Sequence, residues 1–258
     1  TNATFDLAQA DGGLAILEKA TGRRIAAARA HYTRSNERAE LLGDVVWTQS
    51  EQSGRADRLV FDRANGSVRA EGRVTLRVPA ETLGLTAMFG AASNAASLEL
   101  TADSVFSHTN LVIAEGRVHL QTGTNRLACE KLTARLDAGR QNVETALAEG
   151  GVQVLRSGGT LRAQRAEYAR AARRVVFSGQ PEWSDARSRG RAARLTVETQ
   201  TGNLFAEEDV SVTLELGDQS GSPLALFPEA ATNAAPRVIR VSAQSLATEA
   251  GRAVFSGG

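Results

Sequence analysis

Apolar and polar residues alternate along most of this chain, and the alternation has a period of two. The stretch from 68 to 77 shows it most clearly, because Val68, Ala70, Val74 and Leu76 fall on one face and polar or charged side chains fall between them. Alternation of this kind over several residues is typical of a β-strand with one buried face. Helical spacing is weak by comparison, so the pattern predicts an all-β protein.

The alternating stretches belong to a repeat. Seven segments that each begin with a small residue align with one another, and they cover residues 27–43, 56–72, 102–116, 129–150, 163–179, 192–208 and 243–257. Six of the seven end in glycine, and valine stands two positions after the end of five of them. Consecutive segments start 27 to 51 residues apart, with a basic spacing of about 29. Seven aligned copies indicate a protein built from stacked units.

Each unit is predicted to be a strand–turn–strand hairpin. The middle of a unit contains turn-forming residues, as at 35–37, 65–66, 201–203 and 250–251, and glycine and asparagine tolerate the positive φ of tight turns. A glycine in mid-strand, such as Gly72, usually marks a bend or bulge. Because the glycine recurs at the same place in the units, we expect a sheet folded along a line into two walls. Stacked neighbours then bury an apolar interior that one hairpin cannot bury alone.

The predicted architecture is a single elongated, twisted β-jellyroll of stacked bent hairpins, open at both ends, formed as one domain by residues 1–258. Two long intervals between units contain insertions near 79–97 and 217–237, whose small and polar residues predict surface loops. The inward face is predicted to comprise Val45, Trp47, Leu59, Phe61, Val74, Leu76, Val118, Leu120, Val152, Val154, Phe177, Trp183, Leu195, Val197, Val210, Val212 and Leu214. The two tryptophans are bulky members of this set, and we interpret them as plugs of the interior.

The charge balance excludes one class of partner. Thirty lysines and arginines face 29 aspartates and glutamates, and the net charge of +1 leaves no basic footprint for a nucleic acid. Only Lys19 and Lys131 are lysines, so arginine supplies 28 of the 30 cations. Many arginines alternate with apolar residues, which predicts a solvated outer face that discourages unwanted edge pairing. The alternative role for these arginines is to bind a lipid phosphate through the two-pronged guanidinium.

Residue types that carry catalysis or bind metals are few. Cys129 is the only cysteine, which excludes an intrachain disulfide and a cysteine-based zinc site. His31, His108 and His119 have no partner at metal-ligand spacing. The sequence contains no nucleophile-elbow, phosphate-loop or zinc-protease motif. We therefore expect neither enzyme activity nor a metal or other cofactor.

The order of residue types within a unit resembles the OstA/LptA family. The succession runs from a small residue through an apolar and an aromatic position to a turn, and then along an apolar strand that ends in Gly-x-Val. The best stretches are 163–168, 174–179 and 190–197, and residues 56–74 and 102–118 fit as well. The resemblance covers most of residues 25–258.

This resemblance implies a function as well as a fold. The family implies a periplasmic protein that carries lipopolysaccharide from the inner to the outer membrane, with the acyl chains in an apolar trough between two sheets. It also implies partners of the same architecture, LptC-like and LptD-like proteins, that join edge strand to edge strand. Lipopolysaccharide or a related acylated lipid is therefore the expected ligand.

The small residues of the inward face support a hollow interior independently of the family. Ala39, Ala70, Ala114, Ala148 and Ala206 leave space that an alkyl chain could fill, and each buried methylene contributes about 0.8 kcal/mol. On this basis we expect Ala114→Trp or Ala148→Trp to block lipid binding. Two alternatives stay open at this point: a structural cell-envelope β-solenoid that polymerises without a ligand, and a carbohydrate-active β-helix enzyme, for which the repeats show no stacked row of charged residues.

The chain starts and ends near the middle of a unit. Residues 12–17 resemble 150–155, which form only the closing half of a unit, and the last unit stops at Gly258 where its siblings continue. We expect either a piece of a longer protein or open edges that complete each other in a head-to-tail homo-oligomer. No apolar run approaches the ~20 residues of a membrane-spanning helix. The start at Thr1 without methionine suggests a mature or trimmed form.

Overall fold

The computed structural model describes residues 7–18, 22–80, 97–139, 142–156, 158–186, 188–216, 237–249 and 252–257. All regular secondary structure in these residues is β-strand, which confirms the all-β prediction. Within the described part of the chain, no helix is long and apolar enough to cross a membrane. The predicted insertions near 79–97 and 217–237, and the turn at 250–251, lie almost entirely outside the described residues.

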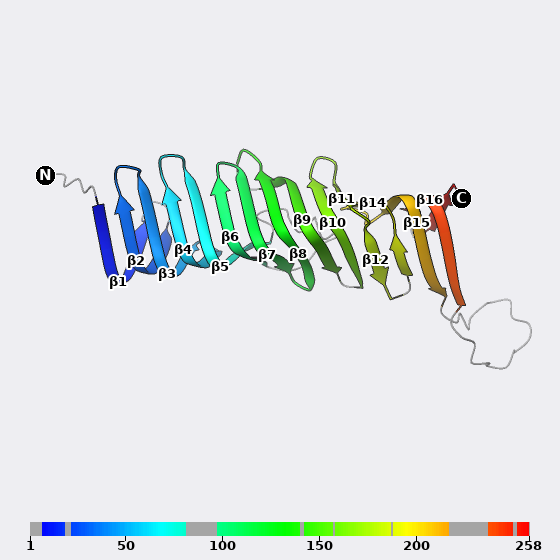
Figure 1. Cartoon of the computed structure of the whole chain (residues 1–258), viewed down its shortest axis with the longest axis horizontal. Coiled ribbons are helices and arrows are strands. Elements are labelled where there is room, and N and C mark those ends of the chain that lie inside the picture. Colours follow the sequence, from blue (N-terminus) through cyan, green and yellow to red (C-terminus); the bar gives the residue numbers. More distant parts are fainter. Residues whose placement is uncertain are drawn as a thin grey trace, which may run out of the picture.

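Seventeen strands follow one another along the long axis of the molecule (Figure 1). They are β1 (Leu7–Glu18), β2 (Arg23–Thr33), β3 (Arg38–Gln49), β4 (Gln52–Asp62), β5 (Ser67–Pro79), β6 (Ser97–His108), β7 (Leu111–Thr122), β8 (Asn125–Leu136), β9 (Val143–Arg156), β10 (Gly159–Ala169), β11 (Arg174–Ser178), β12 (Glu182–Asp185), β13 (Ser188–Arg191), β14 (Arg194–Glu198), β15 (Leu204–Leu216), β16 (Arg237–Glu249) and β17 (Arg252–Ser256).

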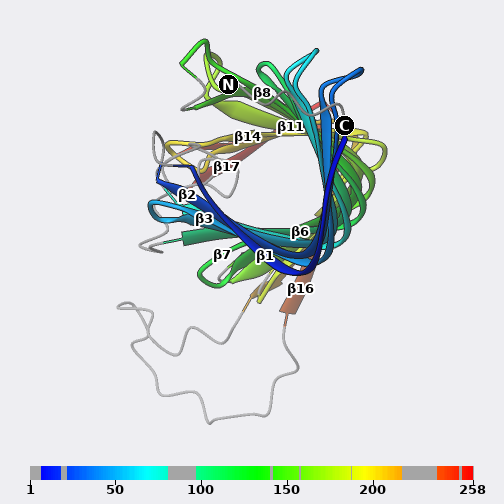
Figure 2. The ribbon, with the colours of Figure 1, turned by 90° about the vertical axis from the view of Figure 1, so that its left-hand side faces the viewer.

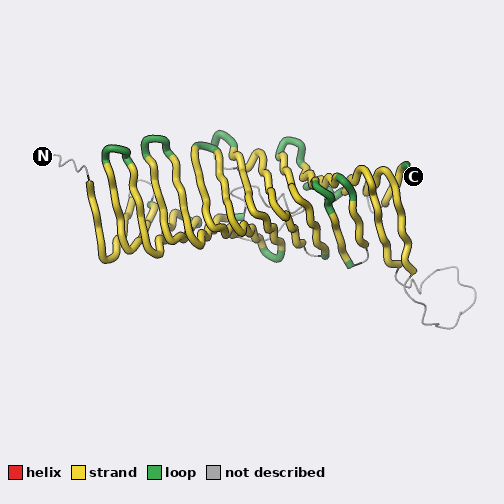
Figure 3. The backbone as a smooth tube through the Cα atoms, in the orientation of Figure 1, coloured by secondary structure: helices red, strands yellow, loops and turns green. Residues whose placement is uncertain are grey.

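Strands β1 to β10 form an antiparallel meander in which each strand pairs with the next. Beyond β10 the sheet divides, because one half of β10 pairs with β11 and the other half with β12. Strand β11 then pairs with β14, β12 pairs with β13, and β15 rejoins both branches. Strands β16 and β17 complete the sheet. Figure 3 shows the strands stacked along the molecule with short connections.

Each long strand bends in the middle, so the sheet has two walls. The register between neighbouring strands shifts at the bend, for example between Leu42 and Val45 of β3 and between Glu71 and Val74 of β5. We call the part of each strand that leads to the hairpin turn within a unit the first wall, and the remainder the second wall. Figure 2 shows the strands running along one wall, turning, and continuing along the other around a common interior. The predicted bent hairpins are confirmed.

In β1, β3, β5, β7, β9 and β15, two consecutive residues with positive φ produce the bend. In β5 they are Gly72 (φ 73°) and Arg73 (φ 46°), and in β7 they are Gly116 (φ 76°) and Arg117 (φ 46°). The first position requires glycine for a second reason, since a Cβ atom at Gly116 would lie 2.8 Å from the Cβ of Asp103 on the preceding strand. The recurring glycine of the repeat therefore allows both the left-handed backbone and the close approach of two strands.

The inner side of the bend is the most deeply buried part of the molecule. The five valines that stand two positions after the bend are 0–1% exposed, and they are Val45, Val74, Val118, Val152 and Val210. Each lies opposite a small residue that opens a unit: Ala56, Ala102, Cys129, Ala163 or Ala243. A large residue facing a small one fills the corner without voids. The repeat pattern of small residue, glycine and valine is thus the pattern of this corner.

Candidate functional site

The two walls enclose one continuous apolar cluster. All seventeen residues predicted to face inward lie in it or pack against it: twelve are buried, and Trp47, Phe61, Leu76, Trp183 and Leu214 are partly buried. Four of these five partly buried residues line the two cavities described below, and Leu214 lines neither.

The first cavity lies between the walls in the N-terminal half and has a volume of about 220 Å³. Strands β2, β3 and β5 contribute Ile25, Trp47 and Leu76 from the second wall, and β4 contributes Leu59 and Phe61 from the first wall. The remaining apolar members of the lining are Val68, Ala70 and Val105. The cavity is thus bounded by both walls and is mostly apolar.

The second cavity lies between the walls in the C-terminal half and also has a volume of about 220 Å³. Val154, Leu161 and Trp183 line it from the second wall, and Phe177 and Val197 line it from the first wall. Eight of the seventeen predicted residues therefore line one cavity or the other. The five corner valines line neither interior cavity.

The two tryptophans occupy equivalent places. Trp47 pairs with Gly54 of the next strand, and Trp183 pairs with Gly190 of the next strand. A Cβ atom built on either glycine would lie 2.8 Å from the Cη2 atom of the indole. Each ring therefore lies over the neighbouring backbone and fills the side-chain space that the glycine leaves. Each indole covers its own wall, and a cavity remains beside it. The interpretation of the two tryptophans as plugs stays a prediction.

Several lining residues were not in the predicted set. Ile25 and Leu161 lie directly opposite Trp47 and Trp183 on the preceding strands, so cross-strand register could have found them. Of the polar residues in the two linings, Arg23 had a sign in the sequence, because it belongs to a pair of adjacent arginines at 23–24 that could stand at a rim. The others stand at strand ends, where the alternation stops.

The polar part of each lining contains one arginine beside other polar groups. At the first cavity, the Nε and Nη2 atoms of Arg23 donate hydrogen bonds to Oε1 of Gln49 at 3.1 and 3.0 Å. At the second cavity, Arg156 belongs to the lining together with Thr160 and Ser184, whose hydroxyl oxygens lie 2.8 Å apart. Asp185 contributes a carboxylate there as well. An apolar chamber with a guanidinium in its lining suits an alkyl chain with a polar or anionic end.

The interior is packed between the two cavities. Leu98, Leu120 and Leu127 of the second wall are 1–2% exposed, and Ala114 and Ala148 of the first wall are 0–1% exposed. Ala114 and Ala148 therefore border no cavity, whereas Ala70, another of the five small residues named from the sequence, lines the first cavity. The expectation that Ala114→Trp or Ala148→Trp blocks binding in an intact fold stays a prediction, and the close packing adds an expected cost in stability.

The outer face is held together by ion pairs across neighbouring strands. At the bends, Arg73 pairs with Asp57 and Arg117 pairs with Asp103, each at 2.6 Å. The hydrogen bonds from these arginines lower the pKa of both aspartates. On the first wall, Arg58 bridges Glu40 and Glu71 on the two adjacent strands. Many outer arginines thus have carboxylate partners, in keeping with the predicted outer face.

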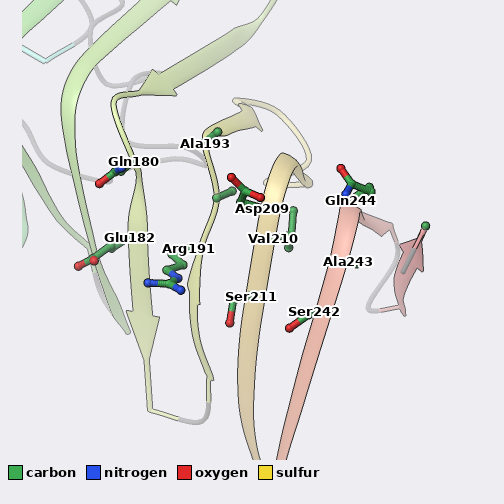
Figure 4. A pocket seen from close by; sticks show the side chains of 12 residues that line it. Gln180, Glu182, Arg191, Ala193, Asp209, Val210, Ser211, Ser242, Ala243 and Gln244 are labelled. Atoms are coloured by element: carbon green, nitrogen blue, oxygen red, sulfur yellow. The ribbon is translucent and has the colours of Figure 1, made fainter.

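A polar groove of about 600 Å³ runs over the outer side of the bend where the sheet divides (Figure 4). Glu182, Arg191, Ser211 and Ser242 line it from four neighbouring strands, and the alternation places them on the opposite side of the sheet from Trp183. Its lining combines both charges with amides and hydroxyls. It is separate from the apolar interior.

The described residues show no arrangement for metal or thiol chemistry. Among them, no group of three histidine, cysteine, aspartate or glutamate side chains could hold a metal ion. Cys129 is buried in the corner, and burial raises the pKa of its thiol to about 11. The thiol therefore stays protonated near neutral pH and packs as a small apolar side chain.

Comparison with known proteins places the chain beside one family. Residues 96–203, which contain β6 to β14, match the family described as LptA/(LptD N-terminal domain) LPS transport protein. The resemblance to the OstA/LptA family is thereby confirmed over this segment. Among solved structures, the chain is similar to LptH from Pseudomonas aeruginosa, described as the LptA-homologous periplasmic component of the lipopolysaccharide transport device. That likeness has 18% identity and a TM-score of 0.39, and it covers 56% of this chain and 93% of that one. No curated protein matches.

Proposed function

We propose, from the match of residues 96–203 to the family of lipopolysaccharide transport proteins, that this protein binds lipopolysaccharide or a related acylated lipid and carries it between membranes. The match supports a role in lipopolysaccharide transport. The observation that carries the binding site is the apolar interior, where two cavities open between the walls of one bent sheet. No polar machinery is needed for this task, because apolar contact alone retains an alkyl chain.

The energetics of such binding follow from area and methylene count. Each methylene transferred from water into an apolar site contributes about 0.8 kcal/mol, so a chain segment of a few methylenes gives useful affinity even after the cost of ordering it. Binding of this kind does not depend on one polar contact. It therefore suits a carrier that must accept the lipid and release it again.

A role in lipopolysaccharide transport supports a location in the periplasm, between the inner and the outer membrane. The free edges of the sheet are the outer edge of β1 and the edge formed by β16 and β17. We propose that these edges pair with edge strands of LptC-like and LptD-like proteins or of further copies of this chain. Pairing of this kind would align the apolar interior of one protein with that of the next.

A structural β-solenoid that polymerises without a ligand is the second candidate. The exposed large apolar residues of the end strands favour some end-to-end assembly, and these residues are Leu7, Ile16, Leu17, Val238, Ile239 and Val254. Assembly alone does not require a hollow interior, since a scaffold is more stable with a filled core. The two apolar cavities therefore favour the carrier over the scaffold.

Lipid uptake by the purified protein tests the proposal. Lipid that copurifies is identified by mass spectrometry, the protein is delipidated, and lipopolysaccharide is added back together with a fluorescent acyl probe. We expect lipopolysaccharide to be retained and to displace the probe. The inward variant Leu76→Asp should lose this binding, and the variant Thr75→Asp, one residue away on the outward side of β5, should keep it. A folded, delipidated protein that takes up neither lipid contradicts the proposal and leaves the scaffold.

A further inference from the structure

The two cavities are built to the same plan although their residues are far apart in the chain. Each has a tryptophan on the second wall, Trp47 or Trp183, and a phenylalanine on the first wall, Phe61 or Phe177. In each, the indole lies over a glycine of the next strand, Gly54 or Gly190. The volumes agree at about 220 Å³. The repeated pattern of small residue, glycine and valine does not account for this similarity, because the other units have no tryptophan at the equivalent position.

The size of each cavity fits part of a lipid. An apolar cavity of about 150 Å³ already binds benzene, whereas sites for whole drug-sized ligands measure about 300–1,000 Å³. A chamber of about 220 Å³ therefore accommodates a segment of one alkyl chain. Each lining includes one arginine, Arg23 or Arg156, whose guanidinium would suit an anionic group at the end of that chain, and the second lining also includes the carboxylate of Asp185.

The two chambers are separated by packed structure. The first is lined by residues of β2 to β6, and the second by residues from β9 onward, so β7 and β8 contribute to neither lining. Leu120 of β7 and Leu127 of β8 are 1–2% exposed. Among the residues that the structure describes, the interior is thus hollow at these two places and filled by β7 and β8 between them.

The glycines keep the chambers open. Any side chain at Gly54 would overlap the ring of Trp47, and any side chain at Gly190 would overlap the ring of Trp183. With glycine, the ring lies flat over the neighbouring strand. A methyl group on the glycine would displace the indole ring. The adjoining cavity is the unfilled space beside the ring, so the ring would move into it.

From these observations we propose that the interior holds acyl chains at two separate stations, and that the Trp47–Gly54 and Trp183–Gly190 pairs each keep one station open. This inference rests on the proposed function, because it assigns the way in which the same interior holds its lipid. The ligand class is an alkyl chain that bears an anionic end group.

The sequence supplies its own reporters, because Trp47 and Trp183 are the only two tryptophans in the chain. The variants Trp183→Phe and Trp47→Phe each leave one fluorescent indole, at the first or at the second station. Stearic acid brominated in mid-chain quenches an indole that it contacts. We expect the probe to quench the remaining indole of each single-tryptophan protein by at least half at saturation, and two probe molecules to bind per chain of the parent protein.

The outcomes separate this inference from the proposed function. Quenching of only one of the two proteins, or a saturating ratio of one probe per chain, overturns the two stations. Retention of lipopolysaccharide without quenching in either protein also overturns them and leaves the carrier function intact. Failure to take up any lipid in the uptake assay contradicts the carrier function itself.

The glycine pairs are tested in the same proteins. Gly54→Ala in the Trp183→Phe background should shift the emission of Trp47 and reduce its quenching several-fold. The same substitution in the Trp47→Phe background should leave quenching of Trp183 unchanged, which also demonstrates an intact fold. Gly190→Ala should show the reciprocal pattern. Unchanged quenching of Trp47 in the folded Gly54→Ala protein would overturn the role of the glycine.

Discussion

At the scale of single residues, the geometry of the bend explains why the repeat has glycine at one fixed position. Two left-handed residues in succession turn the strand, and the first must also tolerate a neighbour at van der Waals distance. Only glycine satisfies both conditions at Gly72 and Gly116. The second left-handed position leaves room for a side chain, and arginine occupies it in both strands.

These two conditions can be separated by a pair of substitutions. Gly66 has a positive φ of 69° in a hairpin turn and no atom within 4 Å of a Cβ, whereas a Cβ at Gly116 would meet Asp103. We expect Gly66→Ala to cost about 1–2 kcal/mol, the strain of the left-handed backbone alone. Gly116→Ala should cost about 1–3 kcal/mol more through overpacking. Urea denaturation followed by circular dichroism measures both, and equal costs would show that close packing at the bend is unimportant.

The ion pairs at the bends make stability depend on pH. Arg73 and Arg117 lower the pKa of Asp57 and Asp103 in the folded protein. A carboxyl group whose folded pKa is lowered stabilises the fold fully above its unfolded pKa of ~3.9. That contribution is lost as the pH falls through the lower, folded value. We expect Tm to fall less between pH 6 and pH 3 in Asp57→Asn/Asp103→Asn than in the parent protein, and an identical fall in both would contradict the assignment.

The sequence predicts which face of a strand points inward, but not where that face is hollow. Alanine at 114 and 148 suggested empty space, yet both alanines are buried in packed structure. Tryptophan at 47 and 183 suggested plugs, yet both border the cavities. The reason is that a cavity depends on the side chains of both walls and of the next strand, including glycines such as Gly54. The alternation of apolar and polar residues within one strand does not show how these side chains pack together.

The packing around Ala148 gives a direct prediction. Ala148 is 0% exposed and lies opposite Leu132 and Ala166 on the neighbouring strands. We expect Ala148→Trp to lower the free energy of unfolding by about 1–3 kcal/mol or more. Ala39, which has the same residue type but is only half-buried, should tolerate a larger side chain at lower cost. Thermal denaturation compares the two variants, and a fully stable Ala148→Trp protein would show that the centre of the interior is loosely packed.

At the scale of elements, the end strands differ from those between them. Six of the nine exposed large apolar residues within the described chain lie on β1, β16 or β17. Interior strands are covered by a neighbour on both edges, whereas the outer edge of β1 and most of one edge of β16 have unpaired backbone groups available. Exposed apolar side chains beside a free edge are typical of strands that pair with another chain.

We predict that copies of this chain associate end to end through these strands. Val238 and Ile239 of β16 are 53% and 44% exposed. The variant Val238→Lys/Ile239→Lys should weaken self-association at least tenfold, as measured by analytical ultracentrifugation. Val46 and Leu155 are similarly exposed, at 41% and 44%, but lie on strands paired at both edges. Val46→Lys/Leu155→Lys should leave association unchanged, and equal loss in both variants would indicate general surface attraction instead of edge pairing.

The hairpins and their bends could be predicted because they are local. Each unit contains its own turn residues, glycine and valine, and β2 to β10 follow that pattern. The division of the sheet into β11 to β14 was not predicted. Its local sign is Pro181, which stands where other units place valine and cannot donate a ladder hydrogen bond. How neighbouring strands then pair around the break depends on contacts far apart in sequence.

At the scale of the whole molecule, the fold is one bent sheet whose interior is lined from end to end by apolar residues. Two cavities open in that interior, and both are bounded by the two walls together. The acyl chain of a lipid would therefore contact both walls at once. The central claim is that the lipid lies inside the bend and not on the outer surface.

Site-specific photocrosslinking tests this claim most directly, because the chain offers matched phenylalanines on the two faces. Phe61 and Phe177 line the cavities. Phe106 lies outward beneath the guanidinium of Arg69, and Phe205 is 42% exposed on the outer face. A benzophenone-bearing phenylalanine at each position is irradiated with bound lipopolysaccharide. We predict crosslinks at 61 and 177 and none at 106 and 205. Crosslinks at the outward positions, with none at the inward ones, would contradict the account.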